Sequence, residues 1–191
     1  MRKYYFVIGF VMGMIAYHVP DLLKISETSQ NPFHAYVDGH PVHWVPGRTM
    51  CLKIEQVASS KKLEDHIRRS LNDFSRLTGI AHSLKCSRYN ILVIIDKREN
   101  LNYLSTNRAI GATTYSQRTS RTREIDCGQI QLDSDFIFGS SPKLIELLIL
   151  HELGHAVGLA HQNDGGIMEE IVDEEHALRF NSNAIEEFQP A

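Results

Sequence analysis

The chain lacks a strong bias toward charge of one sign. Among its 191 residues, 20 are Lys or Arg and 23 are Asp or Glu, so the formal net charge is −3 with acids and bases interspersed. Such a distribution offers no electrostatic basis for binding nucleic acid or an anionic membrane surface, and neither is an expected partner. Once a leader is set aside, the length suits one domain with a sizeable core.

Cysteine is also scarce. Cys51, Cys86 and Cys127 lie far apart and form no CxxC pair, which excludes a cysteine-ligated zinc site. In an oxidising compartment two of the three could form a disulfide and leave one over, and the sequence does not determine which two. The alternative is that all three are small buried hydrophobic residues.

The apolar run Tyr4–Tyr17 is shorter than the roughly 20 residues that a membrane span typically needs. Arg2 and Lys3 precede it, as in the positive start of a secretory signal, but no small-x-small cleavage site stands out. We interpret residues 1–19 as either a signal peptide or an uncleaved N-terminal membrane anchor. Either way the rest of the chain is expected outside the cytoplasm: secreted, periplasmic or membrane-anchored.

Residues 20–48 contain several prolines and no sustained hydrophobic period, which favours a linker or extended segment. His34, His40 and His43 lie in it. They indicate either an accessory metal site or masking segment, or exposed loop histidines, and their spacing suits no regular ligand geometry.

Beyond residue 48, hydrophobic periodicity predicts alternating strands and helices. A strand, a helix capped by Ser60 and two further strands come first, so the crossover is expected to be right-handed with parallel pairing. Near the C-terminus, Asn183 and Glu186 resemble a capping box. The expected strands are residues 49–56, 81–87, 89–96, 110–116 and 128–132, and the expected helices are residues 60–77, 143–158 and 184–189.

The sequence HELGHAVGLAH, residues 151–161, lies at the end of the second of these helices. His151 and His155 are four residues apart, so on a helix they lie on one face about one turn, roughly 5.4 Å, from each other. Gly158 allows the chain to leave the helix, and His161 then supplies a third imidazole. Three neutral nitrogen ligands leave the fourth position of Zn²⁺ open to water, which is typical of a catalytic site. Taken singly, each histidine is better explained as a core residue; together they indicate a metal site.

The motif HExxHxxGxxH resembles that of the metzincin zinc peptidases, with Glu152 in the position of the general base. Gly166-Ile167-Met168 resembles the methionine turn beneath the family's metal. We interpret the chain as closest to the matrix metalloprotease branch, in a minimal form with its catalytic domain at residues 49–191. The resemblance implies an α+β fold with a twisted, mixed, five-stranded sheet, a backing helix, a zinc-site helix and a C-terminal helix. It further implies that Met168 forms a floor under the imidazoles, and that substrate pairs in extended form with the edge strand at Ala112, Thr113, Thr114 and Tyr115.

The chain departs from the matrix metalloproteases in several places. Residues 98–140 contain no histidine, so the second, structural zinc of that branch is expected to be absent. A Ca²⁺ site is left open, because Asp126, Asp133 and Asp135 have suitable oxygens but no EF-hand-like spacing. No PRCGxxD-like stretch supports latency by a cysteine, and Glu170 stands where some metzincins have a tyrosine.

The resulting hypothesis is an exported zinc endopeptidase acting on extended protein or peptide substrates. One Zn²⁺ held by His151, His155 and His161 would activate water, and Glu152 would take the water's proton and pass it to the departing amine. The alternative is a catalytically weak, zinc-containing peptide-binding module. A narrower one is an exopeptidase. Substrate, cleavage specificity and oligomeric state do not follow from the sequence.

Overall fold

The structure is a computed structural model of the whole chain. It describes residues 36–37, 40–56, 60–101, 104, 110–117, 124–170, 173–175 and 178–185. Residues 1–19, in which a signal peptide or anchor is predicted, lie outside these ranges. No helix within the described ranges is long and apolar enough to cross a membrane.

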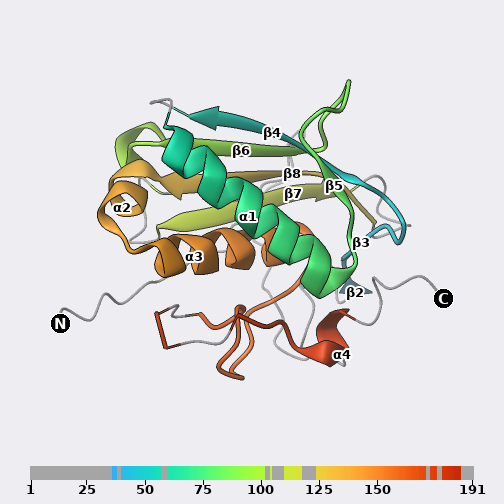
Figure 1. The fold of residues 1–191 in the computed structure, drawn as a ribbon. Helices are drawn as coiled ribbons and strands as arrows, with labels where there is room; N and C mark the ends of the chain where they lie inside the picture. Colours follow the sequence, from blue (N-terminus) through green and yellow to red (C-terminus); the bar gives the residue numbers. More distant parts are fainter. Residues whose placement is uncertain are drawn as a thin grey trace, which may run out of the picture.

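A twisted, mixed sheet forms the centre of the molecule (Figure 1). Its strand order is β3-β8-β6-β4-β5, and β7 pairs with β8. All these pairs are parallel except β7 with β8, which is antiparallel, so the predicted mixed sheet and parallel crossover are confirmed. The strands are β3 (His43–Trp44), β4 (Met50–Gln56), β5 (His82–Ser83), β6 (Ile91–Asp96), β7 (Gly111–Gln117) and β8 (Glu124–Asp133). A separate two-stranded pair is formed by β1 (Tyr36–Val37) and β2 (His40–Pro41).

The backing helix is α1 (Lys61–Thr78). The Ser60 hydroxyl accepts a hydrogen bond from the Leu63 amide, and Gly79 ends the helix at a φ of 76°. The predicted apolar stripe of α1 is buried against the sheet and against α3 (Pro142–Ala156), which lies along β7 (Figure 1). The predicted Ser60 cap and the α+β class are therefore confirmed. The buried stripe consists of Leu63, Ile67, Leu71 and Phe74.

Three elements differ from the sequence-based expectation. The strand expected over residues 81–87 is reduced to β5, while β8 begins at Glu124, four residues earlier than expected. The helix α2 (Ser134–Gly139) was not predicted, because six residues are too few to show a helical period. It is capped by Asp133, whose carboxylate accepts a hydrogen bond from the Asp135 amide at 3.0 Å.

Among the described residues the sheet has six strands rather than the five expected, and the additional one lies within residues 20–48. Val42 and Trp44 are 0% and 1% exposed, so they belong to the core ahead of the domain boundary that the sequence places at residue 49. A two-residue strand is too short for periodicity to reveal it, and its burial depends on β8, which lies about eighty residues further along the chain.

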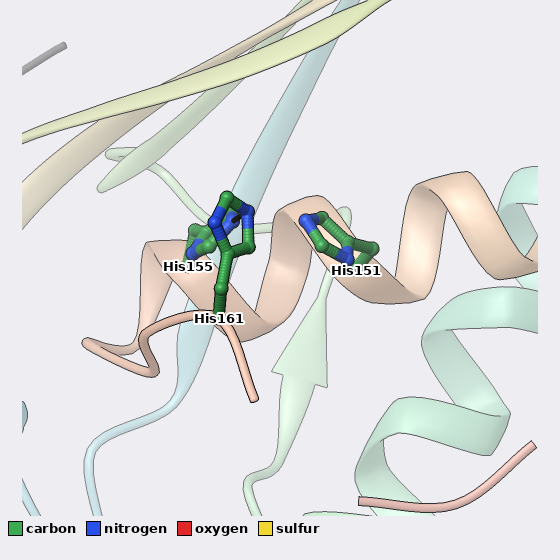
Figure 2. Close-up of side chains that lie close together, drawn as sticks. All are labelled: His151, His155 and His161. Atoms are coloured by element: carbon green, nitrogen blue, oxygen red, sulfur yellow. Dashed lines mark hydrogen bonds between the residues drawn. The ribbon is translucent and has the colours of Figure 1, made fainter. Parts of the chain in front are cut away.

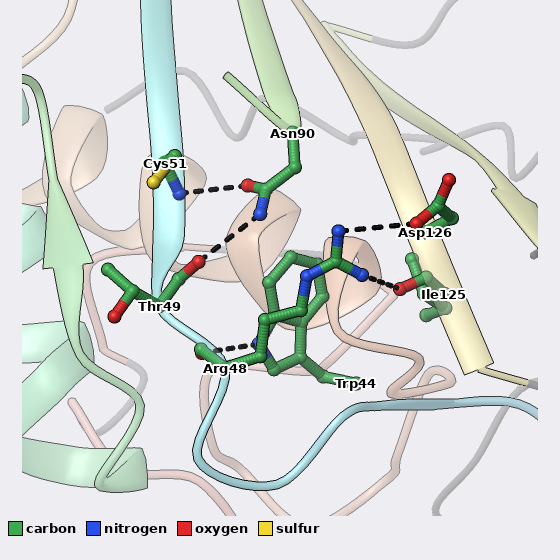
Figure 3. A network of polar contacts seen from close by, with 7 residues as sticks. All are labelled: Trp44, Arg48, Thr49, Cys51, Asn90, Ile125 and Asp126. Atoms are coloured by element: carbon green, nitrogen blue, oxygen red, sulfur yellow. Dashed lines mark hydrogen bonds and ion pairs between the residues drawn. The ribbon is translucent and has the colours of Figure 1, made fainter. Parts of the chain in front are cut away.

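A polar network ties this segment to the sheet (Figure 3). The Arg48 guanidinium lies 5.4 Å from the centre of the Trp44 ring and donates to the Ile125 carbonyl and the Asp126 carboxylate, each at 3.2 Å. The Asn90 side chain accepts from the Cys51 amide at 2.8 Å and donates to the Thr49 carbonyl at 3.2 Å. These bonds connect the chain before β4 to β8 and to the start of β6.

Cys51 on β4 forms a disulfide with Cys86, and Cys127 is an exposed thiol outside that bond. Of the alternatives left open by the sequence, the structure therefore has two bridged cysteines and one left over.

The last described helix is α4 (Ser182–Ile185). It begins before Asn183, so the predicted cap at that residue is wrong. Instead the Asn181 side chain accepts from the Asn183 amide at 3.1 Å. Residues 186–191, which include Glu186 and most of the predicted helix, lie outside the described ranges.

Candidate metal centre

The site is built on the C-terminal half of α3. Ser141 caps this helix by accepting from the Leu144 amide at 3.3 Å, and Pro142 occupies its first turn, both as predicted. From Leu147 to Ala156 every residue of the helix is buried. Side chains on a packed helix hold their positions closely, so His151 and His155 are fixed relative to each other.

The chain leaves α3 at Ala156, two residues before the predicted end at Gly158. The amides of Gly158 and Leu159 donate to the carbonyls of His155 and Gly154, at 2.9 and 3.0 Å, which closes the helix end. Gly158 itself has a φ of 100°, a conformation that side chains with a Cβ rarely adopt. This turn directs His161 back toward the helix.

The side chains of the three histidines lie close together (Figure 2). Their ligand atoms all lie within 4.8 Å of one another, and the Nε2 atoms of His155 and His161 are 3.1 Å apart. The sequence therefore predicted correctly which three imidazoles would come together.

Backbone carbonyls orient two of the rings. His151 Nδ1 lies 2.8 Å from the Ile167 carbonyl and His155 Nδ1 lies 2.7 Å from the Leu159 carbonyl. Since a carbonyl only accepts, each Nδ1 carries the proton and each Nε2 presents a lone pair to the cluster. Within the described residues, the buried Nε2 of His151 has no hydrogen-bond partner. A buried lone pair without a donor, facing two other imidazoles, fits a bound cation.

Burial also keeps these rings neutral. It lowers the pKa of His151 to about 3, with a further contribution from His161. Burial likewise lowers the pKa of His155 well below its usual value and that of His161 to a smaller extent. A neutral imidazole is the form that binds metal, so the site can take up an ion near neutral pH without first losing protons.

Glu152, which follows His151 on α3, is fully buried. Its Oε2 accepts a hydrogen bond from the Thr113 hydroxyl at 2.6 Å, and Oε1 has no partner among the described residues. Burial raises the pKa of this carboxyl to about 8, and the Thr113 hydrogen bond opposes the increase. A carboxyl with a pKa near neutrality is suited to accepting and returning a proton.

Met168 lies beneath α3 and is 1% exposed. A Cβ added to Gly154 would lie only 2.3 Å from the Met168 sulfur, so the side chain packs directly under the helix between the two histidine positions. Its carbonyl accepts from the Gln162 amide at 2.8 Å, which ties it to the residue after His161. That Met168 forms a floor under the imidazoles stays a prediction.

The strand predicted to pair with substrate is β7, which packs along α3. Its side chains are buried: Ala112 and Thr113 are 1% exposed, and Thr114 and Tyr115 are 8% exposed. The contact between Thr113 and Glu152 was not predicted, since it joins residues that are 39 positions apart. Pairing of this strand with substrate stays a prediction.

The other candidate sites do not join the cluster. His43 is half-buried on β3 with Nδ1 3.2 Å from the Trp44 carbonyl, and His34 lies outside the described residues. Asp126 pairs with Arg48 and Asp133 with Arg98, at 3.2 and 3.0 Å. In the described ranges, the histidine triad is the one group of three or more potential ligands, so a Ca²⁺ site at these aspartates gains no support.

Similarity to known proteins is limited to solved structures of low sequence identity. No family model and no curated protein match the chain. Among solved structures, one described as the structure of myroilysin matches with a TM-score of 0.42 and 12% identity, over 65% of this chain and 46% of that one. A second, a crystal structure of myroilysin, matches with a TM-score of 0.43 and 14% identity, over 81% of this chain and 61% of that one. This chain thus spans less than two thirds of the length of either.

Proposed function

We propose that this protein is a zinc-dependent endopeptidase of the metzincin type, related to the matrix metalloprotease branch. The observation that carries the proposal is the convergence of the buried His151 and His155 with the half-buried His161, on the helix that also carries the buried carboxyl of Glu152. The donor set supports Zn²⁺ as the ion, because three imidazoles with an open position are typical of catalytic zinc.

When bound, Zn²⁺ supplies Lewis acidity that makes a water molecule more acidic and polarises a peptide carbonyl. The three histidines would hold the ion from one side and leave the other side to water and substrate. Glu152 would accept the proton of the attacking water, with its unpartnered Oε1 as the acceptor. The same carboxyl would then donate that proton to the departing amine.

The proposed substrate is an extended segment of a protein or peptide. Within the described ranges, β8 is the one strand that pairs with β7, and we propose that substrate forms main-chain hydrogen bonds with the other edge of β7. Extended peptides bind to such edges by adding a strand. We assign this role to Ala112–Tyr115, beside the carboxyl of Glu152.

We further propose that the protein acts outside the cytoplasm. The Cys51–Cys86 disulfide supports this, because such bonds persist mainly in oxidising compartments. The basic and apolar start of the chain supports it independently.

A second candidate function is a zinc-containing peptide-binding module with little catalysis. The complete burial of Glu152 favours it, because a general base must reach the water that it deprotonates. Both candidate functions predict one bound zinc ion, but only the endopeptidase predicts that peptides are cleaved.

The test compares the full chain with Glu152→Gln, and uses Glu99→Gln, an exposed carboxylate on the short helix η1 (Arg98–Asn100), as a matched control. Zinc content is measured by mass spectrometry, and cleavage is measured on fluorescein-labelled casein and a broad peptide library. We expect one zinc per chain in all three proteins, cleavage that a chelator abolishes, and a loss of about 10²-fold or more in Glu152→Gln. Zinc binding without cleavage would favour the binding module, and a chain that binds no zinc would contradict both.

A further inference from the structure

The slot that holds the Glu152 carboxylate is made by two residues of β7. Thr113 is 1% exposed, and its hydroxyl lies 2.6 Å from Glu152 Oε2 and 3.0 Å from the Glu152 carbonyl. The shorter of these distances lies at the short end of the range for O–H···O hydrogen bonds.

Gly111 forms the other wall of the slot. It lies two positions before Thr113, so both residues face the same side of the strand. A Cβ on Gly111 would lie 2.4 Å from Glu152 Oε1 and 2.9 Å from Glu152 Cδ. A side chain at this position would therefore displace the carboxylate from its observed place.

Together these contacts restrict a side chain that would otherwise rotate. Glutamate has several rotatable bonds, and fixing them costs conformational entropy unless specific contacts compensate. The Thr113 hydroxyl holds Oε2, and Oε1 occupies space that a Cβ on Gly111 would fill. The unpartnered oxygen is thus held in one place, which is the arrangement that proton transfer requires.

The hydroxyl also suits both forms of the carboxyl. With one proton and two lone pairs, it can donate to an ionised Oε2, or accept from a protonated Oε2 and turn its own proton to the Glu152 carbonyl. The carboxyl would therefore keep its place while it gains and returns a proton.

We infer that Thr113 and Gly111 are positioning residues that hold the Glu152 carboxylate in a single orientation for proton transfer. The inference rests on the proposed function for its effect on catalysis. The contact between Gly111 and the Glu152 carboxylate is tested separately by protein stability, which does not depend on activity.

The activity test compares Thr113→Val, which removes the hydroxyl at nearly constant shape, with Thr113→Ser, which restores it. Thr78→Val is the matched control, because Thr78 is also fully buried with its hydroxyl donating to a helix carbonyl, at the end of α1. On labelled casein we expect Thr113→Val to lower kcat about tenfold or more with little change in KM, as for the loss of a hydrogen bond to a charged group. We expect Thr113→Ser to recover most of that loss and Thr78→Val to leave kcat nearly unchanged. Equal kcat in the Val and Ser variants of Thr113 would overturn the inference.

The second test measures urea unfolding midpoints with a chelator present, so that metal affinity has no influence. Gly111→Ala is made in the natural chain and in Glu152→Ala, in which the clashing carboxylate is absent. We expect the midpoint shift to be at least halved in the Glu152→Ala background, with a remainder from Leu148, whose Cδ1 would lie 3.0 Å from the new Cβ. Equal shifts in the two backgrounds would overturn the inference, even if the natural chain cleaves nothing and the proposed function itself fails.

Discussion

Gly158 lies in the metal loop, the segment between the end of α3 and His161. At Gly158 this loop packs against residues 42–44. The φ of 100° at Gly158 excludes most side chains, and a Cβ there would lie 2.3 Å from the Val42 carbonyl oxygen and 3.3 Å from the His43 Cα. Next to it, the Trp44 amide donates to the Val157 carbonyl at 3.1 Å. The obstacle to a larger residue is backbone, so no change of rotamer can relieve it.

The substitution Gly158→Ala therefore combines two costs. Left-handed backbone in a residue with a Cβ costs about 1–2 kcal/mol. Forcing an extra carbon into a packed region adds about 1–3 kcal/mol. Gly79→Ala isolates the first cost, since Gly79 has a φ of 76° and nothing within 4 Å of the added Cβ. We expect Gly158→Ala to lower the free energy of unfolding by about 2–5 kcal/mol and Gly79→Ala by about 1–2 kcal/mol.

Urea titrations of both variants and the natural chain measure this difference. Zinc affinity, measured by competition with a chromophoric chelator, adds a second comparison. Displacing the turn moves His161 away from the other two imidazoles, so we expect at least tenfold weaker zinc binding in Gly158→Ala and no change in Gly79→Ala. Equal destabilisation with unchanged zinc affinity would refute the packing of residues 42–44 against the metal loop.

Three further predictions concern His151, the Cys51–Cys86 disulfide and Met168. In chelator-treated protein, the urea midpoint should fall as pH drops from about 6.5 toward 4, because the unfolded chain binds protons that the folded His151, with its pKa of about 3, does not. The lowered pKa values of His155 and His161 act in the same direction, and together the three histidines should outweigh Glu152, whose raised pKa acts in the opposite direction. A midpoint that rises over this range would contradict the lowered pKa values of the histidines. Reducing the Cys51–Cys86 bond, which closes a loop with a sequence separation of 35, should lower the free energy of unfolding by about 2–4 kcal/mol, whereas Cys127→Ser should change it little; equal effects in calorimetry would exclude the assigned pairing. Met168→Ala should cost about 2–5 kcal/mol in urea titrations, as expected for a methionine that is 1% exposed, while one zinc per chain is retained; loss of zinc would show that the residue does more than pack.

Local patterns predicted the elements that depend on nearby residues. The apolar stripe and Ser60 cap of α1, and the Ser141-Pro142 start of α3, involve residues within a few positions of one another. The same holds for His151 and His155, whose separation of one helical turn follows from helix geometry alone. Such features are visible in any window of about a dozen residues.

Long-range contacts account for what the sequence did not show. Trp44 joins the sheet because β8 lies beside it, and Cys51 bonds to Cys86 because β4 and β5 are neighbours. None of these leaves a period or spacing in the sequence.

The sequence by itself determined the identity of the three imidazoles, since a helical repeat places His151 and His155 on one face of α3 and one glycine lets the chain return with His161. Only the tertiary structure decided how those groups are held. Val42 lies against Gly158, Thr113 donates to Glu152, and the Ile167 carbonyl orients His151. The physical reason is that spacing along a helix follows from backbone geometry, whereas the orientation of a side chain depends on atoms that distant segments bring to it.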